Sequence, residues 1–453
     1  MKAFFPIISL LIVLASTALA QDESREQSGG LARSSAKPRV VVLTDFPPLD
    51  TSIDSGPAHK RSDPDDIQSM VRFLLYANDF DVEGLVASSA TFANIANKQN
   101  IRDILNLYDG VVSNLRKHDG RYPTADHLRS ITWQGRSGTY GRPAKDILGP
   151  DKDSEASEKI IALLDGSDPR PIWFCVWGGS CDLAQALWKI KETRSALEVE
   201  RLLSKVRVYL IGLQDGTGQW LLDTFPKLFV IAAKNTWMGM FGASDLAWVN
   251  ANIRQDHGGL GAIYPTVAMG TKPGVKEGDS PSFMYLVSAC RGLNDPDQPD
   301  QPSWGGQFVH DLVRNHWTDH PAGDKTVKRW NATFENDFAA RMDWCVKAFK
   351  DANHTPVARV KGGLERVVKP GETVKLKAAA TDPDGNRITT KWWQSTEADS
   401  VAATLTIANS DSLDNASFVV PNEPGKQIQI ILEVTDNGTP SLVVYQRVVY
   451  NIN

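Results

Sequence analysis

The sequence predicts a mostly parallel α/β sheet flanked by helices, followed by an immunoglobulin-like antiparallel β-sandwich. Up to about residue 353, short continuous apolar runs alternate with segments of helical periodicity, which is typical of strands buried on both faces. After residue 353 the runs become short and alternating, and turn sequences such as DPDGN, NEPGK and DNGTP separate them. These observations predict two domains, 38–353 and 354–453, the second of them an accessory module.

The N-terminal segment predicts a secreted protein. Residues 1–20 combine Lys2, an apolar run of roughly 13 residues and a small-x-small ending at Ala18 and Ala20, which together indicate a signal peptide cut before Gln21. A membrane anchor is the alternative, but the run is short for a span and no stop-transfer flank follows it. Residues 21–37 are small and polar and predict a disordered linker. We therefore expect an extracellular or periplasmic protein without a membrane span.

The overall composition narrows the class of protein. The chain has 453 residues with 49 Lys and Arg against 54 Asp and Glu, so its net charge is −5 and no basic nucleic-acid surface is expected. Four cysteines are too few for a disulfide scaffold but are compatible with one or two bridges outside the cell. Zinc is not expected, because no His lies near Cys175 or Cys181.

The strands and helices follow one another in an order that places polar residues at one edge of the sheet. Residues 40–43 predict a buried strand that ends at Asp45, 67–75 predict a helix, and VEGLVASS predicts the next strand. RPIWFCVWGG, VRVYLIGL and KLFVIAA predict further strands, with a helix at DLAQALWKI. Ligands of such sheets bind beyond the carboxyl ends of the strands. Asp45, Ser88, Ser89 and the turns in WGGSCD and LQDGTG are expected at this edge.

The stretch SDPDDIQS places Asp63, Asp65 and Asp66 within four positions, directly ahead of the predicted helix. Helix capping is one explanation, since aspartates at a helix start accept backbone N–H bonds and complement the helix dipole. A hard cation such as Ca²⁺ is the other, because it needs several oxygen ligands and offsets the repulsion among carboxylates. The residues alone leave both explanations open.

A strand that ends in Asp45, followed by Asp65 and Asp66 at a helix start and then EGLVASS, resembles the nucleoside hydrolase superfamily. The resemblance is closer to a secreted branch, the cellulose-binding Sde182-like proteins, which combine a nucleoside hydrolase-like domain with a C-terminal β domain. It covers nearly all of 38–453 and includes PDDIQSMVRFLLYANDFDVEGL, HGGLGAIYP, EGDSPSFMYL and GLNDPDQPDQPSWGGQF.

The resemblance implies one Ca²⁺ that grips a sugar diol and the attacking water. Its ligands would be Asp45, Asp65 and Asp66, together with Asp279 in EGDSPSF, for which an ordinary N-cap before Pro281 is the alternative. Asp45 would also accept the proton of the metal-bound water. The insertion FPPLDTSIDSGPAHKRS between the strand and the acidic pair departs from the family and makes the relative placement of the two ligand groups uncertain.

A second departure concerns the acid that protonates the leaving group. The nucleoside hydrolases carry a His immediately before their late Asp, and here that position is Gly278. His257, in the glycine-rich stretch RQDHGGLGAIYP, is the predicted substitute, because an imidazole can donate a proton near neutral pH. Asp256 would orient it, and a purely structural histidine is the alternative.

Aromatic segments predict a face that stacks on sugar or base rings. Trp177 and Trp304 are the predicted exposed stacking residues because each abuts Gly-Gly, and Ser89 is predicted to bind substrate at the sheet edge. In the C-terminal domain, Trp392 and Trp393 either line a glycan site or include one core residue beside a turn.

These observations predict a secreted, Ca²⁺-dependent hydrolase that cleaves the N-ribosyl or sugar–sugar bonds of a nucleoside or carbohydrate, through an oxocarbenium-like transition state. The alternative is a non-catalytic carbohydrate-binding protein, for example a cellulose-binding one, on a degenerate nucleoside hydrolase fold. The missing His before Asp279 favours this alternative, and the retained carboxylates oppose it.

Overall fold

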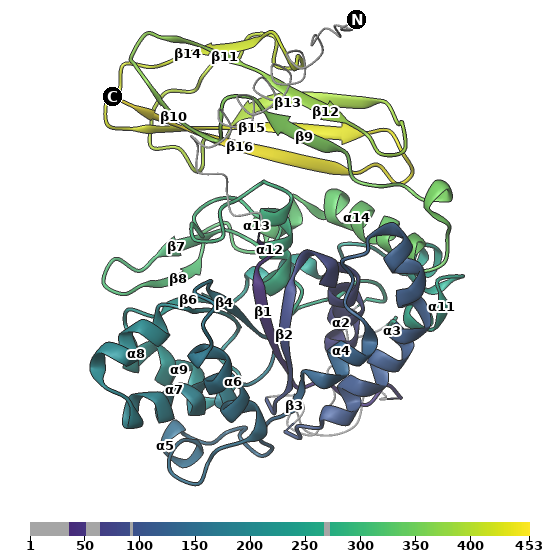
Figure 1. Cartoon of the computed structure of the whole chain (residues 1–453), viewed down its shortest axis with the longest axis vertical. Coiled ribbons are helices and arrows are strands. Elements are labelled where there is room, and N and C mark those ends of the chain that lie inside the picture. The colour runs from purple at the N-terminus through teal and green to yellow at the C-terminus, as the bar shows by residue number, and fades with distance from the viewer. Residues whose placement is uncertain (1–35, 51–63, 91–93, 267–271) are drawn as a thin grey trace, which may run out of the picture.

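A computed structural model describes residues 36–50, 64–90, 94–266 and 272–453 as a large α/β domain with a β domain packed against it (Figure 1). The predicted signal peptide, nearly all of the predicted linker and most of the insertion after Asp45 lie outside the described residues. In the described part of the chain, no helix combines the length and apolarity that a membrane span requires. All four cysteines are free.

The α/β domain is built on an eight-stranded sheet in the order β3-β2-β1-β4-β5-β6-β8-β7. Its strands are parallel except for β7, which pairs antiparallel with β8. This confirms the predicted, mostly parallel sheet. The strands are β1 (Arg39–Thr44), β2 (Asp81–Ala87), β3 (Thr132–Gln134), β4 (Ile172–Val176), β5 (Val206–Ile211), β6 (Phe229–Ala233), β7 (Phe308–His310) and β8 (His316–Asp319).

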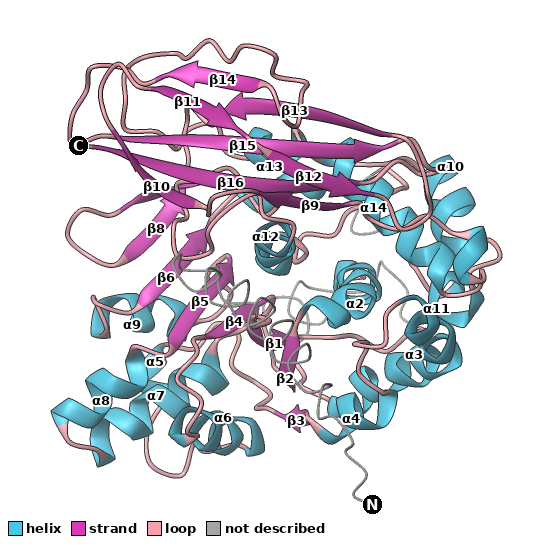
Figure 2. Ribbon diagram, turned by 45° about the horizontal axis from the view of Figure 1, so that its top comes forward, coloured by secondary structure: helices cyan, strands magenta, loops and turns pink. Residues whose placement is uncertain are grey.

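Both faces of the sheet are buried, because successive side chains of a strand point to opposite faces. In β1, Val40 and Val42 belong to one hydrophobic core and Val41 and Leu43 to the other. Figures 1 and 2 show the helices in two groups on either side of the sheet.

The helices of the first core are α2 (Asp65–Tyr76), α3 (Lys98–His118), α4 (Ala125–Ser130), η2 (Thr236–Met240), α10 (Leu246–Val249), α11 (Gly258–Ala262), α12 (Pro281–Cys290), α13 (Lys325–Lys328) and α14 (Asn331–Trp344). Those of the second core are α5 (Ala144–Ile147), α6 (Glu155–Asp165), α7 (Cys181–Thr193), α8 (Ala196–Leu203) and α9 (Gly216–Thr224). Because helices cover both faces of the sheet, the loops from both sides meet at the ends of the strands.

The C-terminal domain consists of antiparallel sheets, as predicted, with one parallel pair. A four-stranded sheet has the order β10-β16-β15-β13, in which β10 and β16 run parallel, and two further sheets are the pairs β11-β14 and β12-β9. The strands are β9 (Val357–Val360), β10 (Glu365–Val368), β11 (Thr373–Leu376), β12 (Ala378–Thr381), β13 (Ile388–Gln394), β14 (Ala416–Val419), β15 (Gln427–Asp436) and β16 (Val443–Ile452).

The two domains share a hydrophobic core. One face of the four-stranded sheet packs on the α/β domain. Its residues Ile431, Val443 and Tyr445 belong to the same hydrophobic core as residues of α2 and α12. Arg447 is 1% exposed, and its Nε donates to the carbonyl of Leu293 at 2.7 Å. The β domain is therefore fixed on the α/β domain by buried contacts.

Candidate functional site

The carboxyl ends of β1, β2, β4 and β5 meet at a crowded edge of the sheet. The carboxylate of Asp45 lies over Gly178, where a Cβ would come within 2.5 Å of Asp45 Oδ1. A Cβ at the next residue, Gly179, would collide with the carbonyl oxygen of Ser89 and lie 2.7 Å from Asp215 Oδ2. The two glycines of the WGG turn therefore allow these segments to approach closely.

Three buried carboxylates converge beside this edge. Asp65 and Asp66 begin α2, Asp279 directly precedes the cap of α12, and one carboxylate oxygen of each lies within 4.8 Å of the others. Asp65 Oδ2 accepts a hydrogen bond from the Gly278 N–H at 3.2 Å, and Asp66 Oδ1 accepts one from the hydroxyl of Thr44 at the end of β1. We call Asp65, Asp66 and Asp279 the acidic cluster.

The structure does not use these aspartates as the N-cap residues of their helices. The N-cap of α2 is Pro64 and that of α12 is Ser280, and neither makes a side-chain cap hydrogen bond. The backbone carbonyl of Asp279 accepts from the Ser282 hydroxyl at 2.7 Å, which fixes the turn into α12. The remaining carboxylate of the sequence motif, Asp63, lies outside the described residues.

A buried ion pair joins the two segments that carry the acidic cluster. Arg72, on α2, is fully buried. Its Nε donates to Glu277, two residues before Asp279, and its Nη2 donates to Glu335 Oε1 at 2.7 Å. The charges of Glu277 and Glu335 hold the pKa of Arg72 well above its usual value, against the effect of burial. Tyr264 also donates to Glu277, at 2.6 Å. This network holds α2 against the segment before α12.

Gln68, one turn into α2, makes a second connection to the same segment. Its Nε2 donates to the carbonyls of Pro265 and Gly274 at 2.7 and 3.1 Å, and its Oε1 accepts the Lys276 N–H at 2.8 Å. Sequence reasoning missed both connections, because Arg72 and Gln68 read as ordinary helix residues.

The acidic cluster fits a divalent cation by the chemistry of its donors. Ca²⁺ takes six to eight oxygen ligands, and three buried carboxylates supply a hard, anionic set for it. A Cβ at Gly278 would lie 2.7 Å from Asp65 Oδ2, so a glycine here allows the backbone to approach the carboxylate of Asp65 closely. Asp45 is not one of the three clustered carboxylates, and the structure places it beside the cluster through its neighbour Thr44.

His257 is not brought to the acidic cluster. It is 7% exposed at the start of α11, with Nε2 3.2 Å from Asp343 Oδ1, so Asp343 takes the orienting role predicted for Asp256. A Cβ at Gly258 would lie 3.1 Å from Val111 Cγ1, which places α11 against the middle of α3. Val111 lies about 20 Å along α3 from Lys98, the first residue of the helix, which follows the carboxyl end of β2. The position of His257 matches a structural histidine.

The expected exposure of Trp177 and Trp304 is wrong. They are 1% and 0% exposed, and Trp177 Nε1 donates to the Ser282 hydroxyl at 2.8 Å. The adjacent glycines bring backbones together above these rings and so bury them. Ser89 is also 0% exposed, and its hydroxyl lies 2.8 Å from that of Thr139, so it joins two loops under the edge.

Two other aromatic residues lie beside the acidic cluster. A Cβ at Gly278 would lie 3.5 Å from Phe241 Cε1 and 3.6 Å from Trp237 Cε3. The two rings are partly exposed and pack edge to face, with centroids 5.4 Å apart, and Lys276 Nζ lies 5.2 Å from the centre of the Phe241 ring. Both belong to the aromatic stretch NTWMGMF, which is the sequence signal that locates them.

An α/β domain with a carboxylate cluster beside the carboxyl edge of its sheet, followed by a β domain, defines a class of nucleoside hydrolase-like proteins. The family described as "Cellulose-binding Sde182, nucleoside hydrolase-like domain" matches residues 57–308, and "Cellulose-binding protein Sde0182, C-terminal domain" matches residues 373–452. The chain therefore belongs to the cellulose-binding Sde182 family, which confirms the predicted resemblance.

A solved structure supports this membership. A nucleoside hydrolase-related hypothetical protein from Saccharophagus degradans, described as associated with carbohydrate metabolism, is 35% identical and has a TM-score of 0.80, over 92% of this chain and 100% of that one. Human CDH23 EC21-23 is 20% identical over 24% of this chain and 37% of its own, with a TM-score of 0.17. No curated protein matches the chain.

Proposed function

We propose that this protein is a secreted carbohydrate-binding protein that holds Ca²⁺ at the acidic cluster and binds a sugar there. The observation that carries the proposal is the convergence of three buried carboxylates beside Gly278, whose N–H donates to Asp65 across 213 residues of sequence. Asp65, Asp66 and Asp279 would hold the cation. When bound, it would supply open coordination positions for a pair of neighbouring hydroxyl groups.

The surroundings of the acidic cluster favour a sugar as the ligand. The partly exposed rings of Trp237 and Phe241 offer an apolar face to the C–H side of a sugar ring, whereas the carboxylates and the cation address its hydroxyls. The name of the family, cellulose-binding, supports this chemistry. The signal peptide predicted over 1–20 supports secretion, which a cellulose-binding role requires.

Hydrolysis of a glycosidic bond, either N-ribosyl or sugar–sugar, is the second candidate for the same site. The position of Asp45 favours it, because this carboxylate lies beside the cluster and could accept the proton of a water that attacks the anomeric carbon. The bond to the leaving group would break, and that group would take up a proton. Gly278 opposes this candidate, because the nucleoside hydrolases carry at this position the histidine that protonates the leaving group. A histidine at position 278 would also displace the carboxylate of Asp65.

The proposed function predicts glycan binding that depends on Ca²⁺. We expect the protein with Ca²⁺ to bind one of a panel of oligosaccharides and nucleosides in calorimetric titrations, and the affinity to fall at least about tenfold in excess EGTA. Asp279→Asn should behave in Ca²⁺ as the wild type does in EGTA. Sugar release in the same samples, measured by chromatography, would establish hydrolysis. Equal glycan affinity with Ca²⁺ and with EGTA would contradict the proposal.

A further inference from the structure

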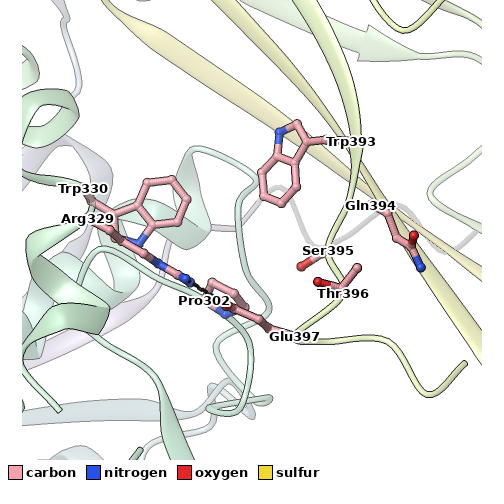
Figure 3. A pocket seen from close by; sticks show the side chains of 8 residues that line it. All are labelled: Pro302, Arg329, Trp330, Trp393, Gln394, Ser395, Thr396 and Glu397. Carbon is pink, nitrogen blue, oxygen red and sulfur yellow. Dashed lines mark hydrogen bonds and ion pairs between the residues drawn. The ribbon is translucent and has the colours of Figure 1, made fainter. Parts of the chain in front are cut away.

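A cavity of about 250 Å³ lies between the two domains, apart from the acidic cluster (Figure 3). Pro302, Arg329 and Trp330 line it from the α/β domain, and Trp393 and the turn that follows β13 line it from the β domain. Neither the family descriptions nor the proposed function assigns a role to this cavity.

Two tryptophans form its apolar walls. Trp330 and Trp393 are partly exposed, and Figure 3 shows their indole rings on either side of the gap between the domains. Trp393 Nε1 donates to Glu433 Oε2 at 3.2 Å, and Trp330 packs edge to face on Tyr445 at 6.2 Å between centroids. Each ring is therefore held in place before a ligand arrives, which lowers the entropic cost of binding.

The polar lining carries no net charge. The guanidinium of Arg329 donates two hydrogen bonds to the carboxylate of Glu397, at 2.8 and 2.7 Å, and they lower the pKa of Glu397. No other residue that lines the cavity is ionisable in the neutral range. A bidentate pair satisfies both charges, so the cavity favours a neutral ligand over an anion or a cation.

Two buried polar groups of the lining have no protein partner. Ser395 is 2% exposed, and among the described residues neither its hydroxyl nor Trp330 Nε1 has a hydrogen-bond partner. Figure 3 shows the hydroxyl oxygens of Ser395 and Thr396 directed toward the Trp330 side of the cavity. Buried polar groups are almost always hydrogen-bonded, so these groups indicate a polar ligand or water in this space.

We propose that this cavity is a second carbohydrate site, which binds one neutral sugar unit of a glycan chain between Trp330 and Trp393 without a metal. The inference rests on the proposed function for the nature of the ligand. A sugar ring presents C–H faces to the two indoles and hydroxyls to Ser395, Thr396 and the Arg329 pair. The cavity is slightly smaller than common small-molecule pockets, so the rest of the chain would lie outside it.

The cavity and the acidic cluster can be tested separately. Helices α13 and η2 lie between them. Trp330 of the cavity follows α13, and Trp237 beside the acidic cluster belongs to η2. The two helices pack closely, because a Cβ at Gly239 of η2 would collide with Val327 of α13. Trp393 lies on β13, whereas the acidic cluster lies beside the starts of α2 and α12, so we expect Trp393→Ala to leave the acidic cluster unchanged.

The test measures the binding of β-glucan hexasaccharides in excess EGTA. Tryptophan fluorescence and calorimetry detect the binding. The wild type should bind, and Trp393→Ala should lose about tenfold or more in affinity. Thr396→Trp, at an exposed position on the rim, should cause the same loss by filling the cavity without removing packing. Trp188→Ala, at a partly exposed tryptophan of α7 outside the cavity, is the matched control and should bind normally.

The outcomes separate the two proposals. If the wild type binds in EGTA and both cavity variants lose affinity, the cavity site stands, whatever the effect of Ca²⁺ on Asp279→Asn. If wild-type binding disappears in EGTA, or if Trp393→Ala and Thr396→Trp both bind as the wild type does, the cavity site is wrong. In either of these cases, the metal-dependent site can still hold.

Discussion

A chain that ends at residue 353 is expected not to fold to a stable native state. Removal of β15 and β16 would expose the side of the α/β core that Ile431, Val443 and Tyr445 cover, and would remove the buried hydrogen bond from Arg447 to the Leu293 carbonyl. Exposed apolar area costs about 25 cal/mol per Å², and a native protein has only about 5–15 kcal/mol of stability to lose. Circular dichroism and urea unfolding of the truncated protein measure the result.

The matched control is a chain that begins at residue 36, which removes only residues outside the described structure. It should unfold with the same midpoint and slope as the mature protein. A soluble chain that ends at residue 353 and unfolds cooperatively, with a free energy within about 1 kcal/mol of the value for the mature protein, would show that the shared core contributes little.

Arg72→Met is expected to lower the free energy of unfolding by about 3–5 kcal/mol, because it leaves the buried carboxylates of Glu277 and Glu335 without their cation. The guanidinium also lies 3.9 Å from the centre of the Phe338 ring, a contact that methionine only partly replaces. Because this network joins α2 to the segment before α12, the variant should also bind Ca²⁺ more weakly than the wild type. Urea unfolding and calcium titration measure the two effects.

Arg314→Met makes the same substitution in an exposed ion pair, where Arg314 and Asp223 lie 3.7 Å apart. Such pairs contribute about 0–1 kcal/mol, so this variant should stay close to the wild type. Equal stability of the Arg72 and Arg314 variants would contradict the role of the buried network.

The strands of the main sheet were predictable because both of their faces are buried. The continuous apolar runs that end near Asp45 and Trp177 became β1 and β4, and the periodic segment after Asp66 became α2. The short strands β3, β7 and β8 were not predicted. Strands of three or four residues give too little periodicity, and neighbouring strands decide their pairing.

The acidic cluster was predictable in part. The order of elements placed Asp65 and Asp66 at the carboxyl edge of the sheet, whereas Asp279, in the turn before α12, was expected from the family resemblance. The partners that fix them are distant in sequence: Arg72 and Glu277 are 205 residues apart, and no local pattern links them. Glycine next to tryptophan was misleading, since at Trp177 it marks close backbone packing and burial. The glycines after His257 were misleading in the same way, because they let α11 pack tightly on α3.

Isothermal titration of Ca²⁺ into the metal-free protein tests the central claim, that Asp65, Asp66 and Asp279 form a cation site. We expect one site per chain in the wild type, and at least about a tenfold loss of affinity in Asp66→Asn and in Asp279→Asn, since each removes one anionic ligand. Asp223→Asn, at an exposed carboxylate far from the cluster in sequence, should bind as the wild type does. No heat of Ca²⁺ binding to the wild type, or equal affinity in all four proteins, would contradict the account.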